Sequence, residues 1–299
     1  MLSNDQFEIP DTPLTAADLV GRVVRIVRRN WLPLLKFFLL PMIWYQVSYE
    51  CMWWDPDRYD SNLPAAASFW IVALGVIFNF LSLWELELRK FAVLLFLAGK
   101  VPNLEDALKK AQKKMWLVLL LAVPIFVAEA GTDVLAFFTT KLAESAEHMS
   151  FHDPLMLWSF WLTAAEIMLL MPLLWIGMLN AFYIAILVFE DLNISNACAR
   201  FLNLFSKGFA YISMYMVLMG CVFAPALSLL ALLMPIVIFL PQNEIRFLIS
   251  AIATTVLLTP VDAFWAISVA IGAALLYKQL TAKLEGRDLL DKLEYLQAK

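Results

Sequence analysis

The stretch that decides the fold lies at residues 103–122 and reads NLEDALKKAQKKMWLVLLLA. It begins with Asn103, and Asp106 follows three positions later, an arrangement typical of a helix start at which side chains satisfy the free backbone amides. A short amphipathic segment comes next, and Trp116 then opens a long apolar run. This pattern predicts a surface helix that leads into a membrane-spanning helix.

The same start occurs three times along the chain. Thr15 precedes Asn103 by 88 residues, Asn193 follows it by 90, and each has an acidic or amide residue three positions later. A start that recurs at a nearly fixed period indicates a structural unit used repeatedly. We interpret each unit as a surface helix followed by a membrane hairpin. The predicted units cover about 15–100, 103–190 and 193–285.

Composition supports a membrane protein. Apolar residues make up 62% of the chain and charged residues 16%, and the charged residues cluster between the apolar runs. Because about 20 apolar residues cross the hydrocarbon core of a bilayer, each long run is a candidate span. We predict spans near 31–50, 66–90, 115–138, 155–185, 208–240 and 247–280. The predicted fold class is an all-α membrane protein with six transmembrane helices in three hairpins, each preceded by a cytoplasmic amphipathic surface helix.

The ends of the chain and its basic residues predict its orientation. Residues 1–14 are polar and lack the basic segment and apolar core of a signal peptide, so we expect a cytoplasmic tail before a single membrane domain at 15–299. With the N-terminus inside, only Arg58, Lys141 and Arg246 of the 22 basic residues fall in outer loops. The positive-inside rule then places both termini in the cytoplasm. The expected location is the cytoplasmic (inner) membrane of a bacterium.

Basic residues form a stripe on two of the predicted surface helices. They are Arg22, Arg25 and Arg29 in the first unit, and Lys109, Lys110, Lys113 and Lys114 in the second. Such helices lie in the headgroup plane with the apolar face down, and their cations contact anionic lipid. These basic residues either sense lipid or a membrane-protein partner, or serve only as a topological anchor. Nucleic acid is excluded as a partner, because the chain is acidic overall, with a net charge of −4.

Four acidic residues fall within predicted spans and are the sharpest candidates for a functional site. They are Glu129, Asp133, Glu166 and Asp262. A carboxylate in hydrocarbon is costly, so each should face the bundle interior or water, where it could bind a proton, a cation or a substrate. Hydrogen bonding between helices is the simpler alternative. Asn79 and Asn180 are predicted to bond between helices, and Glu85 with Arg89 to form a pair where a helix leaves the bilayer.

Catalytic groups are scarce in the sequence. His148 and His152, the two histidines of the chain, lie one helical turn apart in a predicted outer loop, a spacing that can hold a divalent metal. A solvated loop is the simpler interpretation. With only these two histidines, a catalytic triad is not expected. We predict that the protein is not an enzyme and has no cofactor and no metal.

Two segments resemble a known membrane family. One is Leu275-Leu276-Tyr277-Lys278-Gln279-Leu280, followed by Lys283, Glu285-Gly286 and Asp288-Leu289; the other is Val188-Phe189-Glu190-Asp191, followed by Ala197, Arg200 and Phe209. Both resemble segments of the glycerophosphoryl diester phosphodiesterase membrane domain family and related bacterial and archaeal polytopic domains of unknown function. Gln279 and Thr281 stand where that family usually has Asp and Arg, so we expect an ion pair of the family to be missing. The resemblance implies a polytopic membrane domain without the soluble phosphodiesterase domain that gives the family its name.

Two hypotheses for function follow. The first is a non-catalytic integral membrane subunit or scaffold that organises a partner or the local lipid at the cytoplasmic membrane. The second is a transporter or lipid-handling protein that uses the four intramembrane carboxylates. Short loops, few catalytic groups and the basic residues of the predicted surface helices favour the first hypothesis.

Overall fold

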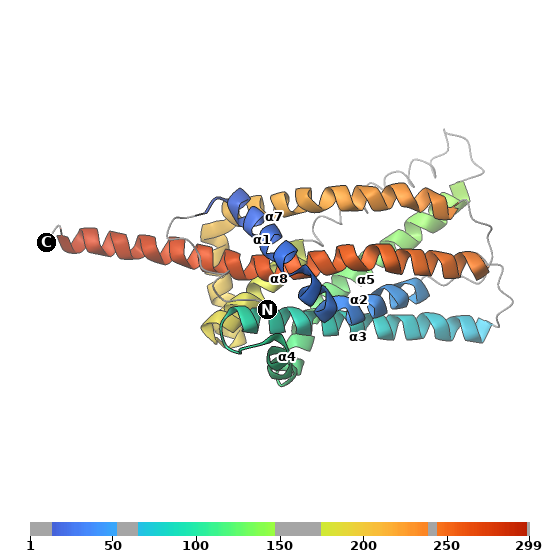
Figure 1. Ribbon diagram of the computed structural model, residues 1–299, viewed down its shortest axis with the longest axis horizontal. Coiled ribbons are helices and arrows are strands. Elements are labelled where there is room, and N and C mark those ends of the chain that lie inside the picture. The colour runs from blue at the N-terminus through green and yellow to red at the C-terminus, as the bar shows by residue number, and fades with distance from the viewer. Residues whose placement is uncertain (1–13, 53–64, 147–174, 239–243, 298–299) are drawn as a thin grey trace.

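The computed structural model describes residues 14–52, 65–146, 175–238 and 244–297, and these are helical without any strand (Figure 1). The helices are α1 (Ala16–Arg29), α2 (Trp31–Met52), α3 (Ala65–Leu97), α4 (Leu104–Gln112), α5 (Met115–Ala146), the helix Trp175–Glu190, α7 (Ile194–Ile238) and α8 (Glu244–Gln297). The all-α prediction is therefore confirmed. Of the predicted fourth span, 155–185, only the end from residue 175 lies within the described residues.

Three of these helices are long and apolar enough to cross a membrane. The qualifying stretches are Ala67–Leu97 of α3, Ile194–Pro225 of α7 and Thr255–Leu284 of α8. A fourth arises if α4 and the first half of α5, which meet at a bend of 88°, are counted as one broken span. A membrane protein is consistent with this result. The six spans and the three repeats stay predictions.

α1 begins and ends where the sequence predicts. The Thr15 hydroxyl accepts a hydrogen bond from the Asp18 amide at 3.2 Å, and the Asp18 carboxylate accepts one from the Thr15 amide at 3.3 Å. The helix stops at Asn30, whose side chain donates back to the Ile26 carbonyl at 3.0 Å. Such reciprocal bonds satisfy backbone groups that a helix start leaves free.

The apolar face of α1 contacts protein. Leu19, Val23 and Val27 are fully buried, and α1 packs against α7 and α8, which it crosses obliquely in Figure 1. This differs from the expectation that the face lies down on lipid. Neighbouring helices of the same chain and acyl chains are equally apolar, so the sequence alone cannot distinguish the two environments.

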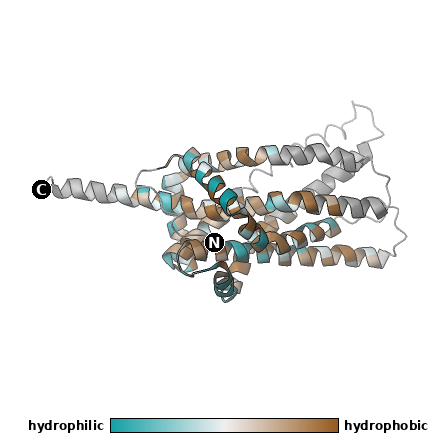
Figure 2. Ribbon diagram, viewed as in Figure 1, coloured by the Kyte–Doolittle hydropathy of each residue, from teal (hydrophilic) through white to brown (hydrophobic). Residues whose placement is uncertain are grey.

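α4 repeats the helix start of α1. The Asn103 side chain accepts a hydrogen bond from the Asp106 amide at 2.8 Å, which confirms the predicted start. Ala107 and Ala111 are fully buried where α4 packs on α3. Hydrophilic residues dominate the rest of this short helix (Figure 2). The chain then turns at Lys113 and Lys114 into α5.

The third unit differs from the other two. The Asn193 side chain accepts from the Asn196 amide at 2.9 Å, as in a helix start, but the chain then continues without a break as the single helix α7. The prediction of a separate third surface helix is therefore wrong. Near the expected break, Gly208 packs against α8, and a β-carbon there would lie 2.8 Å from a methyl of Leu280. At this point α7 approaches α8 closely.

α8 is the centre of the packing. α1, α2, α3 and α7 all contact it, and small residues at turn spacing, such as Ala263, Ala266, Ala270 and Ala273, are buried along it. Small side chains let helix backbones approach closely in membranes. The helix then continues beyond the other helices at its C-terminal end (Figure 1).

Candidate functional site

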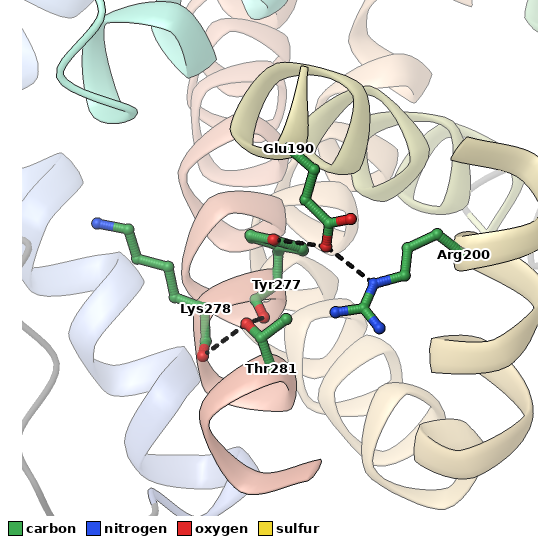
Figure 3. A network of polar contacts seen from close by, with 5 residues as sticks. All are labelled: Glu190, Arg200, Tyr277, Lys278 and Thr281. Atoms are coloured by element: carbon green, nitrogen blue, oxygen red, sulfur yellow. Dashed lines mark hydrogen bonds and ion pairs between the residues drawn. The ribbon is translucent and has the colours of Figure 1, made fainter. Parts of the chain in front are cut away.

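A polar cluster joins three helices at the predicted cytoplasmic end of the bundle. One carboxylate oxygen of Glu190 accepts hydrogen bonds from Arg200 Nε at 2.9 Å and from the Tyr277 hydroxyl at 2.8 Å (Figure 3). Glu190 ends the helix Trp175–Glu190, whereas its partners lie on α7 and α8. The pair is largely shielded, since the Glu190 and Arg200 side chains are 22% and 25% exposed. Partial burial strengthens such a bond relative to an exposed ion pair.

The neighbouring residues of α8 complete this cluster through packing. The Phe189 and Tyr277 rings lie 5.1 Å apart, and the Lys278 ammonium lies 5.5 Å from the centre of the Phe189 ring. The Thr281 hydroxyl donates to the Tyr277 carbonyl at 2.6 Å, within its own helix. The cluster therefore ties helices together, and its members are engaged with one another.

A second ion pair adjoins this cluster at the loop after Glu190. Asp191 pairs with Lys100, which follows the C-terminal turn of α3. This hydrogen bond, with the positive charges of Lys100, Lys114 and Lys110, lowers the pKa of the Asp191 carboxyl. Asp191 adopts φ of 53°, the left-handed conformation that often ends a helix. α3, α4 and this loop are thus linked electrostatically.

Further polar contacts tie α3 to its neighbours. Glu87 is fully buried and accepts from Lys90 at 2.5 Å and from the Asn180 side chain at 3.3 Å, so the predicted interhelical role of Asn180 is confirmed. The predicted Glu85–Arg89 pair is also present, at 2.9 Å. Arg89 additionally donates to a carbonyl of α2, whose Phe37 ring lies 5.0 Å from the guanidinium. These charged groups are therefore engaged in contacts that fix the positions of the helices.

Of the four acids predicted to lie in the membrane, Asp262 is the one whose side chain lies within the described residues. Its carboxylate accepts a hydrogen bond from Gln46 of α2, which is only 3% exposed. Glu129 and Asp133 belong to α5, which packs on α3, but their side chains lie outside the described residues, as does all of Glu166. The four acids therefore stay a predicted site. What the structure adds is Gln46 as the partner of Asp262.

The predicted basic residues lie on the outer sides of α1 and α4. Arg25 and Arg29 are exposed and Arg22 is half-buried, and all three line a groove of about 660 Å³ along α1. The four lysines at 109, 110, 113 and 114 are exposed. Lys109 lies 3.7 Å from Asp106 of its own helix. Because the apolar faces are packed on the bundle, the helices that carry these cations are held in place.

Metal chemistry finds no support among the placed residues. In the four described ranges, no group of three or more His, Cys, Asp and Glu side chains could hold a metal ion. His148 and His152 lie outside those ranges. The prediction for this pair therefore stays untested.

Sequence reasoning missed three of the partners that define these clusters. Gln46, Glu87 and Lys100 were not identified as site residues, although a buried amide and a buried carboxylate in apolar runs are signals of interhelical bonding. Comparison with known proteins adds no identification, because no family model, curated protein or solved structure matches the chain.

Proposed function

We propose that this chain is a non-catalytic integral membrane subunit or scaffold that offers a fixed basic surface to anionic lipid headgroups or to a membrane-protein partner. The surface consists of Arg22, Arg25 and Arg29 on α1 together with the lysines at 109, 110, 113 and 114. In this proposal six spans form three hairpins in the cytoplasmic membrane, with both termini inside.

The observation that supports this proposal is the burial of the apolar faces of α1 and α4. Leu19 and Val23 of α1, and Ala107 of α4, are fully buried against the bundle. A helix anchored in this way cannot dip its apolar face into lipid, so its cationic side is the face left for interaction. Each Lys or Arg near an anionic surface contributes about 1 kcal/mol of attraction.

The polar clusters also fit a structural role. Glu190, Glu87 and Arg89 each bond to a neighbouring helix. Such groups hold a bundle rigid rather than poised for acid–base chemistry. A scaffold needs this rigidity to keep its basic surface in one geometry.

The two segments that carry the family resemblance meet in the same cluster. Glu190 and Arg200 come from one of the two resembling segments and Tyr277 from the other, and the three side chains meet. Kinship with the glycerophosphoryl diester phosphodiesterase membrane domain family stays a proposal that rests on these two segments, because no family model matches the chain.

Purification in native-lipid nanodiscs, followed by mass spectrometry of bound proteins and lipids, tests this function. Replacing the four lysines at 109, 110, 113 and 114 by glutamine should remove the bound partner or the anionic lipid. Replacing the same four by arginine keeps the charge and should retain it. Identical protein and lipid profiles for wild type and both variants would refute the proposal.

A transporter is the alternative, and the buried contact of Asp262 with Gln46 favours it. A carboxylate among packed helices is the usual setting of a proton- or cation-coupled site. In liposomes with a pH-sensitive dye, a transporter should move protons or cations, and the double change Glu166→Gln, Asp262→Asn should abolish this flux. A scaffold should show no flux in either form and keep its bound partner.

A further inference from the structure

A small apolar pocket lies between the helix Trp175–Glu190, α7 and α8. Its volume is about 170 Å³, and Trp175, Met178, Met216, Gly220, Cys221 and Trp265 contribute to its lining. This volume is close to the ~150 Å³ of engineered apolar cavities that stay dry and bind benzene. The lining has the indole rings and flexible thioethers that pack well against hydrocarbon.

Gly220 keeps the pocket open. A β-carbon at this position would meet no other part of the protein within 4 Å, apart from its own turn of helix. In a helix interior, glycine is less favourable than alanine. Here, unlike at Gly208, packing between the described helices does not require glycine. Its structural effect is a hollow in the surface of α7.

The pocket adjoins the surface that would face lipid. It lies along the stretch Ile194–Pro225, which is long and apolar enough to span a membrane. On either side of Gly220, the side chains of Val217 and Val222 are 54% and 39% exposed, and Cys221 is exposed. In a bilayer the medium next to these residues is hydrocarbon.

We propose that this pocket binds the end of a phospholipid acyl chain. The occupant is hydrocarbon because the lining offers indole, thioether, thiol and aliphatic groups and no charged side chain. A headgroup is therefore not recognised here. An empty apolar hollow sacrifices contacts in proportion to its volume, and a chain end from the adjacent leaflet restores them. The inference rests on the membrane location of the proposed function, but not on the basic surface.

A photoreactive lipid tests the pocket directly. The full chain is reconstituted in nanodiscs with a phosphatidylglycerol that carries a diazirine at the end of one acyl chain, irradiated, and mapped by peptide mass spectrometry. Adducts should concentrate at residues 175–178 and 216–224, above exposed lipid-facing positions such as Leu40 and Trp70. Gly220→Leu should reduce adducts in these two segments by about fivefold, because the added side chain takes the contacts of the bound chain.

Matched variants keep the result interpretable. Gly131→Leu places the same side chain at an exposed position of α5 and should leave the adduct map unchanged. Ala224→Leu narrows the pocket from its exposed rim and provides a second test if Gly220→Leu does not fold.

Two results would overturn the proposal. One is labelling that follows exposure alone and does not change in Gly220→Leu or Ala224→Leu. The other is protection of residues 216–224 from the lipid. Neither result bears on the lysine variants, whose partner and lipid profiles test the proposed function separately.

Discussion

At the scale of single residues, Gly272 of α8 makes room for Tyr215 of α7. A β-carbon at position 272 would lie 1.8 Å from the Tyr215 hydroxyl oxygen and 3.0 Å from the ring carbon that carries it. Tyr215 is fully buried, and its hydroxyl has no hydrogen-bond partner in the described part of the chain. The contact is thus one of shape, and glycine is the residue that permits it.

Gly272→Ala should destabilise the protein strongly, because the rigid phenol has to move out of a packed interface. Overpacking of this kind costs about 1–3 kcal/mol. The apparent melting temperature in detergent should fall by several degrees, and Tyr215→Phe in the same chain should recover part of the loss. Gly220→Ala is the control, since its β-carbon meets open space. Equal melting temperatures for Gly272→Ala and wild type would contradict the packing shown by Tyr215.

Glu190 should contribute more to the stability of the fold than either of its partners alone. Glu190→Ala removes the acceptor of both Arg200 and Tyr277, and leaves their donors partly buried without it. We expect a loss of about 1–3 kcal/mol, against about 1 kcal/mol for Tyr277→Phe. A double-mutant cycle of Glu190→Ala with Tyr277→Phe should give a coupling energy clearly different from zero. Additive effects would mean that the hydrogen bond contributes nothing.

The Asp191–Lys100 pair predicts a dependence on pH. The folded state lowers the pKa of Asp191 below its unfolded value, so the pair stabilises the protein above that unfolded value, near 3.9, and the contribution disappears as pH falls through the lower folded pKa. Because the Asp191 side chain is 71% exposed, solvent screening keeps the effect small, below about 1 kcal/mol. Asp191→Asn tolerates the same backbone conformation and is the matched variant.

Melting curves of wild type and Asp191→Asn between pH 3 and 7 measure this contribution. The difference in melting temperature should be largest at neutral pH and should shrink as the pH falls below the unfolded pKa of Asp191. A difference that grows on acidification would contradict the assigned sign.

At the scale of elements, the burial of α1 predicts that it behaves as part of the bundle. Leu19→Ala creates a cavity at a fully buried position, which costs about 2–5 kcal/mol at well-packed sites. Hydrogen exchange at residues 16–29 should therefore accelerate. Leu32→Ala, at a position 61% exposed, is the control and should leave exchange of α1 unchanged. If α1 exchanges as fast in the wild type as in Leu19→Ala, its apolar face is not held by α7 and α8.

Local signals made α1 and α4 predictable. Their caps involve residues three positions apart, so Thr15 with Asp18 and Asn103 with Asp106 could be recognised in the sequence. The missing break in α7 has no such local signal, and Gly208, near the expected break, contacts Leu280, 72 positions away. Whether an apolar face meets lipid or another helix is equally non-local. These are the points at which the structure departs from prediction.

At the scale of the whole molecule, the all-α class followed from the apolar runs, whereas the clusters that join the helices did not. Asp262 was predicted as a candidate, but its partner Gln46 lies 216 positions earlier. Glu190, Arg200 and Tyr277 were noticed through the family resemblance, without any indication that they bond to one another. Long-range pairing of this kind requires the packed bundle.

The predicted topology can be measured on the intact protein in membranes. Single cysteines introduced at Ser61, His148 and Asn243 in the cysteine-free chain should react with a membrane-impermeant maleimide added from outside. Cysteines at Asp5 and Lys299 should react only after the membrane is opened. External reaction at either terminus would contradict the orientation derived from the positive-inside rule.

The continuous course of α8 also has a mechanical consequence. The helix has 54 residues and measures about 80 Å; it runs from Glu244, past the contact of Asp262 with Gln46, to an end that extends past the other helices. Over such a length, a rotation of about 5° at one end displaces the other by roughly 7 Å. A small tilt of α8 within the packed bundle therefore produces a larger displacement of its C-terminal end. A molecule bound to this end would therefore act on the buried contacts of the bundle through α8.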